Sequence, residues 1–138
     1  MSKKSKVLLI LVALVVILAA AVAAVITISE RNQRAIQAVT IADVDLSAIP
    51  DGVFIGKHSA FPVSAEVEVT VSNHQITAIK LLKHINGKGR DAEVIPQRVV
   101  DAQSLTIDTV SGATYSSKVI LLSILNALEN AAGEQGSL

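Results

Sequence analysis

The sequence predicts an α+β fold in which an N-terminal transmembrane helix precedes a small antiparallel sheet with two packed helices. An apolar run without charge occupies residues 7–28 of the 138-residue chain. Apolar and polar residues alternate over residues 63–71, and a second extended segment follows a short polar turn, which predicts a β-hairpin. Apolar residues recur at helical spacing over residues 92–102 and 116–132, so two helices are expected to cover the sheet.

The apolar run is long enough to cross a membrane. Residues 7–28 carry one polar side chain, Thr27, and contain neither glycine nor proline. At about 1.5 Å per residue the run spans roughly 33 Å, against a hydrocarbon core of about 30 Å. A cleaved signal peptide is the alternative, because the lysine-rich start and the alanines at 19–24 also suit one. The apolar region of a signal peptide is typically about 7–15 residues, so we favour an uncleaved anchor.

The charges that flank this run predict its orientation. Three lysines precede residue 7, whereas two basic residues, Arg31 and Arg34, follow residue 28. Cytoplasmic flanks carry the excess of lysine and arginine. We therefore expect a single-pass cell-membrane protein with its N-terminus in the cytoplasm and residues 30–138 outside it.

Composition argues against several classes of function. Without the three N-terminal lysines, nine basic residues face 12 acidic ones, which is the wrong balance for a nucleic-acid partner. The chain has no cysteine, so disulfides, thiolate metal sites and cysteine nucleophiles are excluded. His58 and His74 belong to no ligand pattern, and we expect no metal site.

These patterns divide the chain into five segments. We expect a cytoplasmic basic segment, the transmembrane helix, a linker, the folded domain and a tail, at residues 1–6, 7–28, 29–49, 50–132 and 133–138. The start of the linker could continue the helix beyond the lipid. The domain begins at a Pro-Asp-Gly turn, where proline presets φ and glycine tolerates positive φ.

Three strands are expected in the first half of the domain. Residues 53–57 form a short strand in which Gly56 marks a bulge or a close approach of another backbone. The alternation at 63–71 predicts a strand with one buried and one exposed face, and residues 72–75 form the tight turn to the strand at 76–82. The inward-facing residues of this last strand are expected to be Ile76, Ala78 and one of Leu81 or Leu82.

Two helices follow a polar, glycine-containing loop. Proline is tolerated in the first turn of a helix, so Pro96 places the start of the first helix near Glu93. Residues 105–107 are expected to form a further short strand. The second helix is expected to stop at Gly133 and to leave residues 134–138 as a frayed tail.

A loop rich in hydroxyl groups precedes the second helix. Between residues 108 and 117 an aspartate and five serine or threonine side chains surround Gly112. Free N–H groups and the dipole at a helix N-terminus favour a phosphate, and Gly112 and Ala113 let it approach the main chain. In the simpler alternative, Ser116 or Thr114 caps the helix by bonding its first N–H groups. The residues alone favour the cap.

The same loop resembles a known modification motif. Residues 108–114, with the pattern Asp-x-x-Ser-Gly-Ala-Thr, are similar to the flavinylation motif of the FMN-binding domain family. This family includes a domain of the C and G subunits of ion-pumping NADH:quinone and ferredoxin:NAD oxidoreductases. Residues 51–56 resemble the family's opening segment, although Phe54 stands where the family often has tyrosine. His84 also occupies a family position, and the resemblance covers about residues 50–131.

The resemblance implies that FMN is attached covalently. In the family, the last threonine or serine of the motif carries FMN through a phosphoester, and a separate magnesium-dependent transferase attaches it from FAD. Carried onto this sequence, the acceptor is Thr114, and Ser111 is the competing hydroxyl. Gly112 and Ala113 would supply backbone contacts. Asp108 would serve either recognition by the transferase or the shape of the loop.

Other residues near the motif have two interpretations each. Tyr115 either lies against the flavin ring or covers the edge of the core. His84 either contacts the flavin, as its family position suggests, or is structural. Lys88 and Arg90 either meet the phosphate or a partner, or simply belong to a polar loop.

Together these features predict a membrane-anchored extracytoplasmic flavoprotein that carries electrons with FMN covalently attached to Thr114. The sequence shows no general acid–base pair and no nicotinamide motif, so we expect an electron-transfer module more than a stand-alone enzyme. The expected partners are the membrane, a flavin transferase, and membrane redox proteins or a quinone-linked donor. The alternative is a surface-exposed flavin-binding or sensory module with reversible FMN or none.

Overall fold

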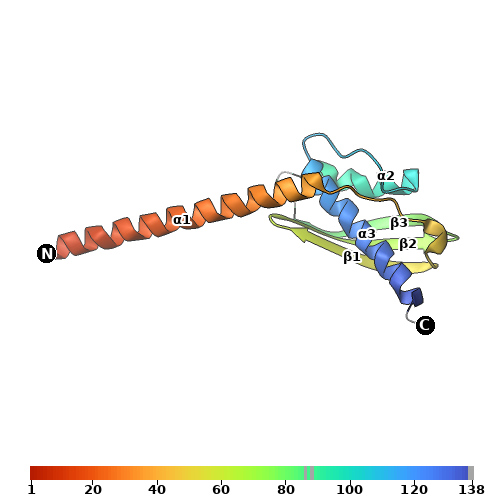
Figure 1. Ribbon diagram of the computed structural model, residues 1–138, viewed down its shortest axis with the longest axis horizontal. Helices are drawn as coiled ribbons and strands as arrows, with labels where there is room; N and C mark the ends of the chain where they lie inside the picture. The colour runs from red at the N-terminus through yellow and green to blue at the C-terminus, as the bar shows by residue number, and fades with distance from the viewer. Residues whose placement is uncertain (86, 88, 137–138) are drawn as a thin grey trace.

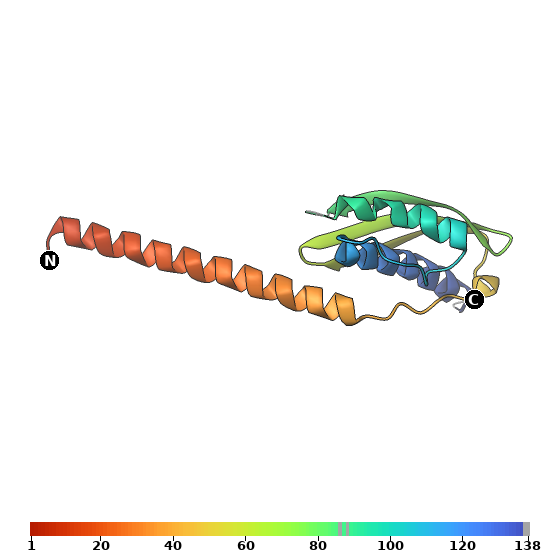
Figure 2. The ribbon, with the colours of Figure 1, turned by 90° about the horizontal axis from the view of Figure 1, so that it is seen from above.

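A long helix, α1 (Lys3–Ala38), leads into an α+β domain in which two helices cover one face of a three-stranded sheet (Figure 1). The computed structural model describes residues 1–85, 87 and 89–136. Seen from above, α1 extends far from the domain, and after its end the chain continues in the same direction along the domain as an extended segment (Figure 2). The predicted α+β class is confirmed.

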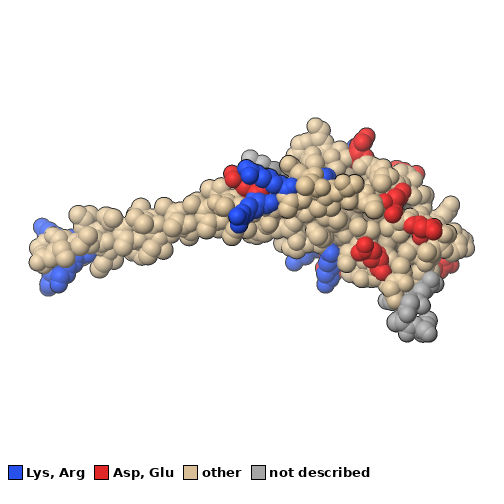
Figure 3. All heavy atoms as spheres, viewed as in Figure 1, with Lys and Arg blue, Asp and Glu red and all other residues tan. Residues whose placement is uncertain are grey.

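Among the described residues, α1 is the helix that is long and apolar enough to cross a membrane. Lysine and arginine side chains lie at its free end and again where it meets the domain, with an uncharged surface between them (Figure 3). No glycine or proline interrupts residues 7–49, and the helix continues past residue 28 to Ala38. The first half of the predicted linker is therefore helical, and a short 3-10 turn, η1 (Leu46–Ala48), lies in its second half.

The sheet has the order β1 (Gly52–Ala60), β2 (Val63–Ser72) and β3 (Gln75–Ile85), and both pairings are antiparallel. In β2 the odd-numbered residues are buried and the even-numbered ones are partly exposed, as the alternation predicts. Asn73 and His74 form the turn between β2 and β3 with φ of 51° and 60°, values typical of a two-residue hairpin. The predicted hairpin is confirmed.

The inward-facing residues of β3 differ from those expected. Its pairing with β2 shifts by one residue at two places, so Thr77 and Leu82 are extra residues. Each extra residue inverts the alternation of faces. Ile76 points inward as expected, but the prediction for Ala78 was wrong, because this residue is exposed. The residues of β3 that turn toward the helices after the first shift are Ile79, Leu81 and His84.

The remaining elements are η2 (Arg90–Val94), α2 (Ile95–Ala102) and α3 (Thr114–Gly136). Pro96 lies in the first turn of α2, as expected. The prediction of a strand at residues 105–107 was wrong. The N–H of Leu105 donates to the carboxylate of Asp43 at 3.0 Å, so this stretch is held by a side chain and does not pair with the sheet.

Both ends of α3 also differ from the ends that the sequence predicts. The helix starts at Thr114 and not at Ser116, and it passes through Gly133 to Gly136. Glycine weakens a helix by about 0.5–1 kcal/mol relative to alanine but keeps its N–H donor, so the hydrogen bonds can continue. Residues 137–138 of the predicted tail lie outside the described residues.

The core forms where α3 lies across β1 and β2. The residues of α3 that point into it include Ile120, Ile124 and Leu128, all fully buried. Gly56 allows this packing, because a Cβ at that position would overlap the backbone of α3 at Ser123 and Ala127. The close backbone approach predicted at Gly56 is confirmed.

The end of α1 is attached to the domain by specific contacts. The Ile36 side chain is buried, with 6% of its surface exposed. The Lys118 ammonium donates to the carbonyl oxygens of Gln37 at 2.6 Å and Val39 at 3.1 Å, so it bonds one carbonyl of the last helical turn and the carbonyl of the residue that follows the helix. The Asn32 amide donates to the carbonyl oxygen of Phe61 at 3.0 Å. The helix thus enters the domain in a defined orientation.

Candidate functional site

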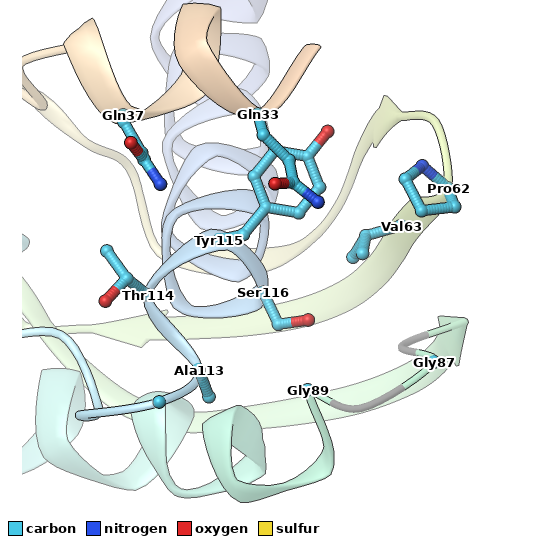
Figure 4. A pocket seen from close by; sticks show the side chains of 11 residues that line it. Gln33, Gln37, Pro62, Val63, Gly87, Gly89, Ala113, Thr114, Tyr115 and Ser116 are labelled. Atoms are coloured by element: carbon cyan, nitrogen blue, oxygen red, sulfur yellow. The ribbon is translucent and has the colours of Figure 1, made fainter. Parts of the chain in front are cut away.

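A cavity of about 540 Å³ lies where the end of α1, the β1–β2 turn, the segment after β3 and the start of α3 meet. Its volume falls within the range of about 300–1,000 Å³ usual for small-molecule sites. Figure 4 shows side chains from α1 and α3 projecting into the same space. The lining residues are Gln33, Gln37, Pro62, Val63, Gly87, Gly89, Gly112, Ala113, Thr114, Tyr115 and Ser116.

The loop before α3 is shaped by a tight turn. The N–H of Ala113 donates to the carbonyl oxygen of Val110 at 2.9 Å, and Gly112 has a φ of 79°. This pattern matches a type II turn, which requires glycine or asparagine at that position. A Cβ at Gly112 would meet no atom within 4 Å, so the backbone conformation, and not space, selects glycine there.

Ser117 stabilises the junction between this loop and α3. Its buried hydroxyl accepts from the N–H of Val110 at 3.0 Å and donates to the carbonyl oxygen of Ala113 at 2.8 Å. The Ser117 hydroxyl therefore bonds the turn and not the first N–H groups of α3, and among the described residues neither Ser116 nor Thr114 forms the expected cap. This leaves the side chains of Thr114 and Ser116 on the wall of the cavity.

The first turn of α3 presents free hydrogen-bond donors at the cavity. Among the described residues, no group accepts a hydrogen bond from the backbone N–H of Thr114, Tyr115 or Ser116. Such donors and the helix dipole attract an anion. The Thr114 hydroxyl lies at this same helix end and is partly exposed. A phosphate and a hydroxyl nucleophile can therefore meet there.

Tyr115 connects α3 to the β1–β2 turn. Its hydroxyl donates to the carbonyl oxygen of Ala60 at 2.7 Å, and the carbonyl oxygen of Phe61 lies 3.1 Å away. Burial raises the pKa of the Tyr115 hydroxyl, so it remains a donor at neutral pH. The ring also lines the cavity, so the structural role is present and the flavin contact remains a prediction.

Three of the residues predicted for the site lie elsewhere. Ser111 is exposed and does not line the cavity. Asp108 lines a second cavity of about 350 Å³, which it shares with Lys118 and residues 39–41. The His84 side chain is 2% exposed, and its Nδ1 lies 3.2 Å from a carboxylate oxygen of Glu93. Their proposed roles toward the cofactor stay predictions.

The remaining charged residues that were considered for the site are Arg90 and Lys88. Arg90 is exposed at the start of η2, and Lys88 lies outside the described residues. Within the described ranges, no group of three or more histidine, aspartate or glutamate side chains could hold a metal ion.

The sequence did not predict that α1 forms one wall of the cavity. Gln33 and Gln37 are four residues apart and so lie on one face of the helix. They were assigned to a linker, although the absence of glycine and proline after residue 28 was a signal for a longer helix. Pro62 and Ser116 also line the cavity, and neither has a local pattern that would identify it.

Comparison with known proteins identifies the folded part of the chain. Residues 63–129 match the family described as FMN-binding domain. The chain carries an FMN-binding domain. Thr114 and the turn before it lie inside the matched range, whereas α1 lies outside it. The match confirms the family resemblance of the sequence.

The FMN-binding domain also resembles part of a curated protein. It is 40% identical over 75 residues to NADH:acrylate oxidoreductase of Vibrio harveyi. That alignment covers 52% of this chain and 8% of the relative, so the chain corresponds to a small part of that enzyme. No solved structure matches the chain.

The residues of the cavity fit FMN. Its phosphate suits the free N–H groups of α3, and the cavity is large enough for a small organic ligand. The region beside Gly87 and Gly112 is open, since a Cβ at either would meet no atom within 4 Å. The Thr114 hydroxyl also lines the cavity, and it is the group that can form the phosphoester that the family motif implies.

Proposed function

We propose that this protein is a membrane-anchored extracytoplasmic electron carrier that holds FMN through a phosphoester to Thr114. The observation that carries the proposal is that three features of the structure lie next to one another. The Thr114 hydroxyl, the free N–H groups of the first turn of α3 and the 540 Å³ cavity all adjoin each other. The matched FMN-binding domain supports this use of the cavity.

Attachment requires an exposed hydroxyl beside an anion site. The Thr114 oxygen forms a bond to the phosphorus of the FMN half of FAD, the phosphoanhydride bond breaks, AMP leaves, and the hydroxyl proton is released. The diester keeps one negative charge, which the N-terminus of α3 stabilises. A separate flavin transferase is the proposed partner for this step.

The lining of the cavity favours electron transfer over chemistry on a substrate. Among its described residues no aspartate, glutamate, histidine, lysine or arginine is present. Among the same described residues, Tyr115 alone has a side chain of a type used in general acid–base catalysis, and its hydroxyl already donates to the carbonyl oxygen of Ala60. FMN when bound supplies one- and two-electron transfer, and the protein supplies its position and surroundings.

The anchor places this domain beside membrane redox partners. Residues 7–28 are uncharged, and α1 runs without a break from them to the cavity. With the N-terminal lysines in the cytoplasm, the domain lies outside the cell. A quinone-linked donor or a membrane redox protein is the proposed source of electrons. Confinement to the membrane raises the effective concentration of such a partner.

Intact-mass measurement tests the attachment. The full chain is produced with a flavin transferase, denatured and weighed. We expect an increase equal to FMN less one water in the wild type and in Ser111→Ala, and no increase in Thr114→Ala. An unchanged wild-type mass, with yellow colour that washes out on denaturation, would instead support a reversible flavin-binding module.

A further inference from the structure

We propose that Gln33 and Gln37, at the end of α1 that joins the domain, hydrogen-bond the ring system of the bound flavin. This rests on the proposed function, because it assumes that FMN occupies the cavity. The family match starts at residue 63 and so does not account for α1. Both glutamines nevertheless line the cavity together with Thr114 (Figure 4).

The two amides lie on the cavity side of α1 because of helix geometry. Residues four apart are separated by about 40° around a helix with 3.6 residues per turn. Arg31 lies about 160° from Gln33 around the helix, Arg34 lies about 60° from Gln37, and Glu30 lies about 60° from Gln33. None of these three charged residues lines the cavity. The helix therefore presents neutral amides to the cavity and its charges elsewhere.

The contacts around this helix end keep the amides in place. Asn32 bonds the β1–β2 turn, Ile36 is buried, and Lys118 bonds the carbonyl oxygens of the last turn. These three contacts bracket Gln33 and Gln37 along the chain. The two side chains are thus held over the cavity by an ordered piece of backbone.

The amides are available to a ligand and suit the flavin ring. Among the described residues, neither side-chain amide of Gln33 or Gln37 hydrogen-bonds to another protein group. A primary amide offers two donors and an acceptor. The flavin ring carries carbonyl oxygens, ring nitrogens and one N–H, which such amides can pair. The phosphate already has partners in the N–H groups of α3, so we assign the glutamines to the ring.

Titration with free flavins tests the assignment. Full-length Thr114→Ala, which cannot be loaded covalently, is titrated with FMN and with riboflavin, which lacks the phosphate. Loss of two neutral hydrogen bonds predicts that Gln33→Ala/Gln37→Ala weakens both affinities about tenfold, equivalent to about 1.4 kcal/mol. A loss seen with FMN but not with riboflavin assigns the amides to the phosphate and overturns the proposal.

A matched variant controls for the change of residue type. Gln75 and Gln97 are exposed and lie outside the cavity, so Gln75→Ala/Gln97→Ala should leave both affinities unchanged. Gln33→Met/Gln37→Met keeps the side-chain length and helix propensity, and should weaken binding as alanine does. Equal affinities in the cavity and control variants overturn the proposal.

A second readout uses the covalently loaded protein and does not depend on affinity. We expect the glutamine variants to shift the visible absorption of the flavin and to increase quenching of its fluorescence by iodide, relative to the control. Loaded protein whose spectra match the control overturns the role of the glutamines alone. A wild type that gains no mass and binds no free FMN overturns the proposed function itself.

Discussion

Gly56 gives a direct test of how α3 is positioned over the sheet. A Cβ added there overlaps the backbone of α3 at Ser123 and Ala127, and no flexible side chain can move aside. Overpacking of a core typically costs about 1–3 kcal/mol. Because the obstructing atoms include backbone of the central helix, we expect Gly56→Ala to cost about 3 kcal/mol.

The expected loss is large enough for thermal unfolding. In a domain of 60–100 residues, 1 kcal/mol shifts Tm by about 4–8 °C, so Gly56→Ala should lower Tm by about 12–24 °C. The assay is far-UV circular dichroism of the detergent-solubilised full chain. The same change at Gly133 is the control, since a Cβ there meets no atom within 4 Å and the residue is helical.

The two glycine variants should change the Tm in opposite directions. Gly133→Ala removes a helix-weakening residue and should raise stability by up to about 1 kcal/mol. A Tm for Gly56→Ala within about 4 °C of the wild type would show that α3 can move off the sheet at little cost. The close packing would then not explain the glycine.

Three further outcomes follow from single contacts. Tyr115→Phe removes the donor to Ala60 and should cost about 1 kcal/mol in denaturant unfolding; an unchanged midpoint would contradict this. Lys118→Met should speed hydrogen exchange in the last turn of α1, and unaltered protection there would count against the role of the ammonium. The hydrogen bond from Ser104 lowers the pKa of Asp43 below 3.8. A lowered folded-state pKa gives stability that is fully present above the unfolded value of 3.8 and is lost as the pH falls through the lower folded-state pKa. The Tm difference between wild type and Asp43→Asn should therefore shrink as the pH falls below 3.8, and an undiminished difference would refute this.

Local patterns in the sequence predicted the elements that local physics determines. The alternation at 63–71 predicts β2 because a half-buried strand needs that period, and Pro96 limits where α2 can start. Gly56 predicts either a bulge or a close backbone approach, because glycine inside a strand usually has one of these reasons, and the structure shows the close approach. The motif that contains Thr114 placed that residue at a helix N-terminus without any tertiary information.

The predictions failed where contacts between residues far apart in the sequence determine the structure. Nothing in residues 76–85 shows that Thr77 and Leu82 are extra residues in the pairing with β2, so the inward face of β3 was misassigned at Ala78. Several hydroxyls lie near the start of α3, and only the folded turn shows that Ser117 bonds Val110 and Ala113 while, among the described residues, no hydroxyl caps the helix. The α1 wall of the cavity depends on how a helix outside the matched domain packs against it.

Under the proposed function, the unbroken helix between the apolar run and the cavity would set the height of the cofactor above the membrane. With residues 7–28 in the hydrocarbon, Gln33 stands about 7.5 Å and Gln37 about 13.5 Å beyond residue 28 along the axis. The headgroup layer on each side of the bilayer is roughly 5–8 Å thick. The flavin would therefore sit just above the lipid headgroups and could not swing out to a distant acceptor. Under the proposed function, a redox partner would have to dock at that height. Four extra helical residues before Asn32 would raise the site by about 6 Å and rotate it by about 40°.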